Sequence, residues 1–105
     1  MALIYEKKGR IGYIKFNRPE ALNAFDPEQY EEFSHALIDF RDDDELWVAI
    51  ITGTGEKAFS VGADLKKLIP LTMDRTRAQP YKLPPSVTRG LEIWKPIIAA
   101  INGVA

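Results

Sequence analysis

The sequence contains no cysteine and a single histidine among its 105 residues. The lack of cysteine excludes disulfide bridges, thiolate nucleophiles and zinc–thiolate sites, and it is compatible with a reducing compartment. The histidine, His35, lies between the apolar positions Phe33 and Leu37. For His35 we favour a position at the flank of a helix over a role as a general base. No cluster has the spacing of metal ligands, so we expect no metal site.

Long apolar runs and an excess of one charge are also missing. The longest apolar stretches fall far short of the roughly 20 residues needed to span a bilayer. The first ten residues, MALIYEKKGR, lack the apolar segment of a signal peptide. The net charge is −1 and the pI about 5.8, whereas a nucleic-acid-binding domain is expected to be basic. We therefore expect a cytoplasmic protein with no membrane and no nucleic-acid partner.

The composition is that of an ordinary globular domain, with 46% hydrophobic and 28% charged residues. A chain of this length is enough for one small domain, which we assign to residues 1–105. Neither the P-loop spacing nor the dinucleotide-binding glycine pattern is present. The function classes that depend on those two motifs are not indicated.

Hydrophobic periodicity and turn residues predict alternating strands and helices along the chain. The predicted elements are strands at residues 2–8 and 10–16, a helix from Asp26 to about Phe40 or Arg41, a strand at Leu46–Thr52, a short strand at Ala58–Ser60, a helix from Asp64 through Leu68, a surface loop over residues 70–86, a short helix at Val87–Trp94 and a strand at Ile97–Ile101.

The start of the first helix and the character of the strands carry most of this prediction. Asp26 is a good N-cap, Pro27 suits the first helical position, and Gln29 gives a capping-box spacing. Continuous apolar runs such as Leu46–Thr52 are typical of strands buried on both faces of a parallel sheet. The expected class is therefore α/β. The last predicted strand, Ile97–Ile101, has no covering helix after it, so the sequence looks interrupted rather than finished.

A strand–glycine–helix turn is the main candidate for chemistry. Residues 58–65 (AFSVGADL) place Gly62 directly before a helix that Asp64 is expected to cap. The first N–H groups of a helix have no partner within the helix, and they can bind a phosphate or a developing oxyanion. Such turns are also common as purely structural features, so the residues alone leave both interpretations open.

Three segments together resemble the crotonase superfamily, the enoyl-CoA hydratase/isomerase family. They are residues 16–24 (FNRPEALNA), 58–65 (AFSVGADL) and 95–103 (KPIIAAING), and their order and spacing match the family. The similarity runs from Met1 to Ala105 and is weakest over residues 70–90. The resemblance implies a ββα-repeat core with a mainly parallel sheet, of which this chain would be the N-terminal part, incomplete at the C-terminus.

The resemblance also implies a substrate and a site. Family members bind coenzyme A thioesters and hold the thioester oxygen with two backbone N–H groups, which stabilise an enolate. By analogy, the Ala63 N–H is the first donor. Arg18, Lys66 and Lys67 are candidate phosphate partners, with ordinary surface charges as the alternative. No cofactor is implied beyond the coenzyme A of the substrate. The residues that match the substrate and coenzyme A path are Leu22, Ala24, Ser60, Gly62, Ala63, Asp64 and Leu65.

The proton-transfer groups of the family are not found in this sequence. The resemblance places the second N–H and the catalytic glutamates after Ala105, and Glu56, Asp74 and Glu92 match no family acid or base. One hypothesis is an acyl-CoA enzyme, most simply an enoyl-CoA hydratase, which is inactive if the chain truly ends at Ala105; homo-oligomerisation or a missing C-terminal half would cover its open sheet. The other is a non-catalytic remnant, or a small coenzyme A-binding or assembly module that self-associates or needs a partner. Hydratase, isomerase and hydrolase are not distinguished, nor is the acyl chain.

Overall fold

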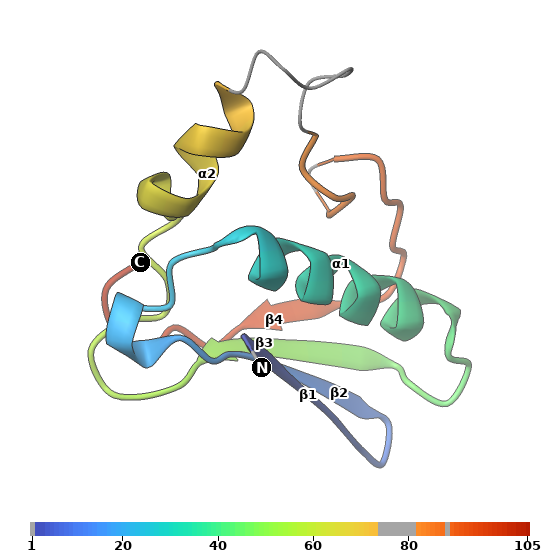
Figure 1. Cartoon of the computed structure of the whole chain (residues 1–105). Coiled ribbons are helices and arrows are strands. Elements are labelled where there is room, and N and C mark those ends of the chain that lie inside the picture. The colour runs from blue at the N-terminus through green and yellow to red at the C-terminus, as the bar shows by residue number, and fades with distance from the viewer. Residues whose placement is uncertain (1, 74–81, 88) are drawn as a thin grey trace.

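The structure, a computed structural model, describes residues 2–73, 82–87 and 89–105 (Figure 1). Its elements are β1 (Leu3–Lys8), β2 (Ile11–Phe16), the 3₁₀ turn η1 (Pro19–Ala21), α1 (Pro27–Asp42), β3 (Val48–Gly53), α2 (Leu65–Thr72) and β4 (Ile97–Ala99).

The strands form a single four-stranded sheet in the order β1-β2-β3-β4. β1 and β2 make an antiparallel hairpin, whereas β2 pairs with β3, and β3 with β4, in parallel. A parallel pair needs a crossover connection, and α1 supplies it between β2 and β3. The predicted α/β class and the mainly parallel sheet are confirmed.

The core lies between α1 and one face of the sheet, as Figure 1 shows. Leu37 and Phe40 of α1 are fully buried, and so is Ile14 of β2. Along β3 the buried positions alternate with half-buried ones, so this strand is fully buried on one face only, and not on both as predicted. α1 begins as expected, because the Asp26 side chain accepts a hydrogen bond from the Gln29 N–H at 2.8 Å.

The predicted strand at Ala58–Ser60 is wrong. Within that stretch the structure has only a single bridge, between Ala58 and Val104. The Ala58 carbonyl accepts from the side-chain amides of Asn23 (2.9 Å) and Asn102 (3.2 Å) rather than from a neighbouring strand. Side-chain donors therefore replace a strand ladder here, and the segment remains a loop.

The predicted helix at Val87–Trp94 is also wrong over its described residues; position 88 lies outside them. Ser86 and Arg89 exchange two backbone hydrogen bonds of 2.9 Å, which closes a tight turn. Gly90 follows with φ +76°, a left-handed conformation that ends any helical path. The turn therefore occupies the backbone N–H and C=O groups of Ser86 and Arg89, which a helix would have needed.

The last two elements differ from expectation in length and burial. α2 includes Pro70 and continues to Thr72, which is four residues beyond the predicted end at Leu68. Part of the loop predicted over residues 70–86 falls on residues 74–81, outside the described part of the chain. β4 is a strand as predicted, but Ile98 is 54% exposed and Ile101 just beyond it is 62% exposed. No described element covers that side of β4. Among the described helices, none is long and apolar enough to cross a membrane.

Candidate functional site

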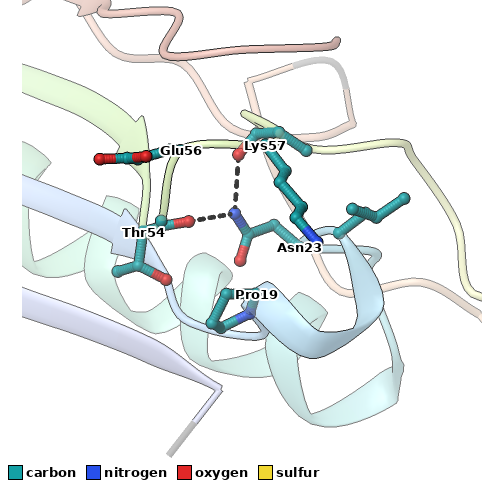
Figure 2. Close-up of a pocket in the computed structure, with 8 residues that line it drawn as sticks. Pro19, Asn23, Thr54, Glu56 and Lys57 are labelled. Carbon is teal, nitrogen blue, oxygen red and sulfur yellow. Dashed lines mark hydrogen bonds between the residues drawn. The ribbon is translucent and has the colours of Figure 1, made fainter.

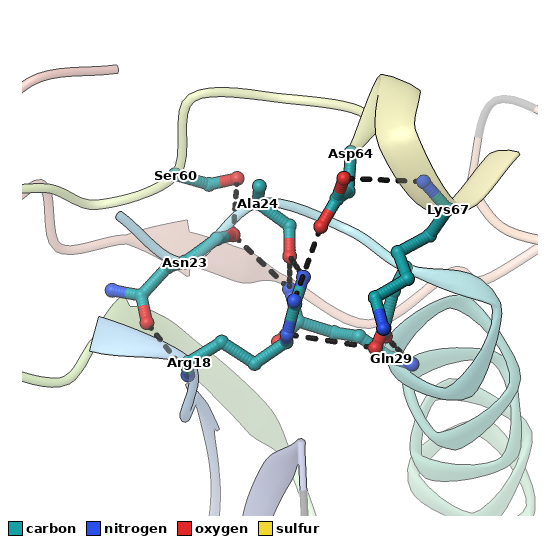
Figure 3. A network of polar contacts seen from close by, with 8 residues as sticks. Arg18, Asn23, Ala24, Gln29, Ser60, Asp64 and Lys67 are labelled. Carbon is teal, nitrogen blue, oxygen red and sulfur yellow. Dashed lines mark hydrogen bonds and ion pairs between the residues drawn. The ribbon is translucent and has the colours of Figure 1, made fainter. Parts of the chain in front are cut away.

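Two chain segments, residues 22–25 and 60–64, lie side by side where β2 and β3 end (Figure 3). The Phe25 N–H donates to the Gly62 carbonyl at 2.7 Å, and the Asp64 N–H donates to the Phe25 carbonyl at 2.8 Å. The Ser60 hydroxyl donates to the Asn23 carbonyl at 2.8 Å. Six of the seven residues predicted to line the site lie on these segments, and the seventh, Leu65, follows directly. The structure thus brings two distant sequence motifs together.

The direction of the Ala63 N–H follows from these contacts. Gly62 C=O and Ala63 N–H belong to one trans peptide plane, in which they point in opposite directions. Since the carbonyl is held by Phe25, the N–H points away from Phe25. It donates to no acceptor within the described residues, and Ala63 is exposed. Gly62 reaches this geometry with φ +92°, which few residues with a side chain adopt.

Asp64 caps the helix that follows. Its side chain accepts from the Lys67 N–H at 3.3 Å, and its own carbonyl accepts from the Leu68 N–H at 3.0 Å. Loss of solvent around the carboxyl raises its pKa, but the hydrogen bonds from Arg18 and Lys67 outweigh this, and the pKa of Asp64 lies below its ordinary value. The helix start therefore carries a carboxylate that stays ionised at neutral pH.

Arg18 connects the starts of both helices (Figure 3). Its guanidinium lies 3.1 Å from the Asp64 carboxylate and 3.5 Å from the carboxylate of Asp26, the N-cap of α1. It also donates to the Ala24 carbonyl at 2.6 Å. The three charged side chains are only 13–15% exposed. Arg18 thus forms an internal ion-pair cluster, and its charge is directed at carboxylates rather than at the surface.

Asn23 is a site residue that the sequence reasoning missed. Its side chain is fully buried and donates to the carbonyls of Thr54 (3.1 Å) and Ala58 (2.9 Å), while it accepts from the Arg18 N–H at 2.9 Å. Its backbone adopts φ +57°. Asparagine tolerates that conformation better than most residues, so the signal was an asparagine inside a turn-rich segment. Asn23 holds the loop after β3 against the turn after β2.

Two pockets border these segments. The first, of about 380 Å³, opens beside η1 and the loop after β3 (Figure 2). It is lined by Pro19, Leu22, Asn23, Thr54, Gly55, Glu56, Lys57 and Ala58. The second, of about 540 Å³, is mainly apolar and aromatic, and the turn at Ser60–Gly62 forms part of its wall. Its aromatic lining residues are Phe16, Phe25, Tyr30, Phe33 and Phe59.

The remaining predicted residues differ in exposure. Leu22 and Leu65 are 41% and 63% exposed, which leaves their side chains free to contact a ligand, whereas Ala24 is buried. Glu56 and Glu92, which match no family acid, are exposed, and Asp74 lies outside the described residues. His35 is exposed on α1, as expected for a residue at the flank of a helix. Within the described residues, no group of three or more His, Cys, Asp or Glu side chains could hold a metal ion.

Comparison with known proteins decides the family. A family model described as enoyl-CoA hydratase/isomerase matches residues 6–105. The chain belongs to this family. Members that resemble it include an (E)-benzylidenesuccinyl-CoA hydratase from Thauera aromatica, 38% identical over all of this chain and 41% of the relative. A carnitinyl-CoA dehydratase from Escherichia coli is 43% identical over 94% of this chain and 37% of the relative.

Solved structures of the enoyl-CoA hydratase/isomerase family share the fold. An enoyl-CoA hydratase from Mycobacterium marinum matches with a TM-score of 0.79 at 33% identity, over 98% of this chain and 49% of that protein. The chain spans about two fifths of the length of the curated relatives it matches. The comparisons thus support the resemblance to an N-terminal portion of the family, while the roles predicted for Ala63 and the path residues stay predictions.

Proposed function

We propose that this family member binds an acyl-CoA thioester and that the Ala63 N–H donates a hydrogen bond to the thioester oxygen. The observation that carries the proposal is the exposed Ala63 N–H, which is held in one direction by the Gly62–Phe25 hydrogen bond. A donor fixed before substrate arrives needs no reorganisation when negative charge develops on the oxygen. The relatives named above act on coenzyme A thioesters by their names, which agrees with this substrate class.

The reaction that fits this donor best is hydration of a 2-enoyl-CoA, with double-bond isomerisation as the near alternative. Water adds to C3 of the enoyl group, and the electron pair moves through C2 onto the thioester oxygen as an enolate, which is then protonated at C2. The Ala63 N–H would stabilise that enolate oxygen. A general base must lie within hydrogen-bond reach of its proton, and this proposal assigns proton transfer to none of the acids in the sequence.

The remainder of the coenzyme A molecule is proposed to follow the two turn segments. Leu22 and Leu65 offer exposed apolar surface, and Ser60 and Gly62 offer a backbone that a ligand can approach closely. Lys66 and Lys67 are exposed, so either can meet a phosphate. No cofactor other than this coenzyme A moiety is proposed, and a cytoplasmic location stays a prediction from the sequence.

The proposal is tested by following the Ala63 amide during titration with acyl-CoA. We expect crotonyl-CoA to shift the Ala63 ¹⁵N–¹H resonance strongly, and free coenzyme A to shift it little, because only the thioester supplies the acceptor. Replacing the Gly62–Ala63 peptide bond with an ester removes the N–H and also weakens the Gly62 carbonyl as an acceptor for the Phe25 N–H. We expect this change to weaken crotonyl-CoA binding by roughly tenfold, the size of one net hydrogen bond, and to leave coenzyme A binding unchanged.

Two results would contradict the proposal. The first is a crotonyl-CoA complex in which the Ala63 resonance does not move. The second is an ester variant that binds crotonyl-CoA as tightly as the unmodified chain. An equal loss of affinity for both ligands would show a distorted fold instead, and circular dichroism of the ester variant separates that case.

A second candidate function has its own supporting observation. Ile98, Ile101 and Val104, which lie in β4 or in the five residues after it, are exposed apolar residues with exposed fractions of 54%, 62% and 63%. Exposed apolar patches of this kind mark interaction surfaces. A non-catalytic binding or assembly module would associate through them, either with a second copy or with another polypeptide. Concentration-dependent sedimentation without any response of Ala63 to crotonyl-CoA favours this module over the enzyme.

A further inference from the structure

The ion-pair cluster around Arg18 bears on how the proposed oxyanion donor is held. We propose that Arg18 is a positioning residue for the Ala63 N–H, acting through Asp64, and that it is not a ligand of the coenzyme A phosphates. This inference rests on the proposed function, because it assigns a role to the side chain behind the same donor.

The charge of Arg18 is directed into the protein. Its side chain is 13% exposed, and its three nitrogens reach acceptors of the protein itself: the Ala24 carbonyl, the Asp26 carboxylate and the Asp64 carboxylate. Its backbone N–H is also bound, by the Asn23 side chain at 2.9 Å. A phosphate would have to displace buried carboxylates to reach it, so the surface role suggested by the sequence does not fit.

Asp64 lies directly next to the proposed donor in the chain. Ala63 is followed by Asp64, whose N–H is bound to Phe25 and whose carboxylate is bound to Arg18. Ala63 is preceded by Gly62, which is exposed and has open space where a side chain would be. Glycine permits rotation of the peptide plane that carries the Ala63 N–H. Because glycine itself restrains the plane little, its direction depends on the Gly62–Phe25 hydrogen bond on one side and, on the other, on Asp64, which Phe25 and Arg18 hold in place.

Arginine suits this position better than lysine does. One guanidinium carries five N–H donors in a planar fork and can serve several acceptors at fixed angles, whereas a lysine ammonium is a single point charge on a flexible stem. Here the fork serves the N-cap carboxylates of both helices and the carbonyl of Ala24. Lysine would keep the charge but would not hold all three acceptors in place.

The test compares affinities for an acyl thioester and for free coenzyme A. We expect Arg18→Gln to weaken crotonyl-CoA binding about tenfold, as loss of a residue that orients a ligand-binding group does. Coenzyme A affinity should stay within about twofold, because the phosphate and adenine contacts are not made by Arg18. Hydrogen exchange of the Phe25 and Asp64 amides, whose hydrogen bonds fix this peptide plane, should become faster in the unliganded protein. Arg18→Lys should give an intermediate loss, and Arg41→Gln is the matched control, since Arg41 forms an exposed ion pair with its neighbour Asp42.

Asp64→Asn supplies a second variant that keeps the helix cap, because asparagine caps helices as well as aspartate does. We expect it to reproduce the loss of thioester affinity, and the double variant Arg18→Gln/Asp64→Asn to be no worse than Arg18→Gln alone. Non-additivity of this kind is the mark of two residues that act as one unit.

Several outcomes would overturn the inference. An equal loss for crotonyl-CoA and coenzyme A in Arg18→Gln, absent in Asp64→Asn, would make Arg18 a phosphate ligand. Full thioester affinity in Arg18→Gln would show that it does not position the donor. A wild-type protein that binds neither ligand would defeat the proposed function alone. Even then, unchanged exchange of the hydrogen-bonded Asp64 amide in Arg18→Gln would refute the positioning role, and faster exchange would support it.

Discussion

Replacing Gly53 with alanine is expected to destabilise the fold by about 3 kcal/mol or more, the upper range for overpacking a tight site. Gly53 ends β3, where the chain passes against the loop that follows. A Cβ atom at this position would lie 2.5 Å from the Phe59 carbonyl oxygen, 2.7 Å from that of Ala58 and 2.7 Å from the Asn23 amide nitrogen. Two of these atoms are backbone, so relief requires the loop to move.

Gly12→Ala is the matched control for this prediction, because Gly12, like Gly53, is a buried glycine in a strand of the sheet. A Cβ there would meet its nearest neighbours, side-chain atoms of Leu46, Phe40 and Tyr5, at 3.4–3.5 Å, which is ordinary contact. Urea unfolding of both variants measures the difference. A Gly53→Ala protein as stable as Gly12→Ala would show that the close approach at the end of β3 does not constrain the fold.

Replacing Asn23 with alanine is expected to lower the free energy of unfolding by about 3 kcal/mol, since it leaves buried backbone groups without partners. The Thr54 carbonyl and the Arg18 N–H both lose their contact with the Asn23 side chain, whereas Ala58 retains the one from Asn102. Alanine must also adopt φ +57°, which adds to the loss. Chemical denaturation followed by tryptophan fluorescence measures the change.

Asn23→Gly separates the two causes. Glycine adopts a positive φ without strain, so this variant removes the strain but still loses the hydrogen bonds, together with some stability because glycine has more freedom in the unfolded chain. We expect it to be more stable than Asn23→Ala and still clearly less stable than the unmodified protein. If Asn23→Gly matched the unmodified protein, the side-chain hydrogen bonds would contribute nothing net, and the account of the site as a loop held by Asn23 would fail.

The parts of the fold that depend on local sequence were predictable. The helix start at Asp26 and Pro27, and the helix start at Asp64, follow from capping residues that act within three positions along the chain. The parallel sheet followed from continuous apolar strands, and the three family motifs located the two segments that meet at the site. For the helix starts and the family motifs, the decisive residues lie within a few positions of one another, whereas the strand pairs of the sheet, such as Ile11 and Val48, are far apart in the chain.

The parts that depend on distant partners were not predictable from the sequence alone. Whether Ala58–Ser60 pairs as a strand depends on Asn23 and Asn102, more than 30 residues away on either side, whose amides take the Ala58 carbonyl. The partners of Arg18 were hidden for the same reason, because Asp64 is 46 residues away from it in the chain. A contact between side chains so far apart in the chain produces no periodic pattern in the sequence, so a surface role was the natural interpretation of Arg18.

The order of the strands gives the sheet a direction of growth. Because strand order equals chain order, each strand adds to the free edge left by the one before it. The β1 edge ends in the charged residues Lys7 and Lys8, which discourage the addition of another strand, whereas β4 carries no charged side chain. Chains generally fold from the N-terminus during synthesis. In a nascent chain, β1, β2 and β3 can therefore form their part of the sheet, and the Gly62–Phe25 contact can form, before β4 leaves the ribosome.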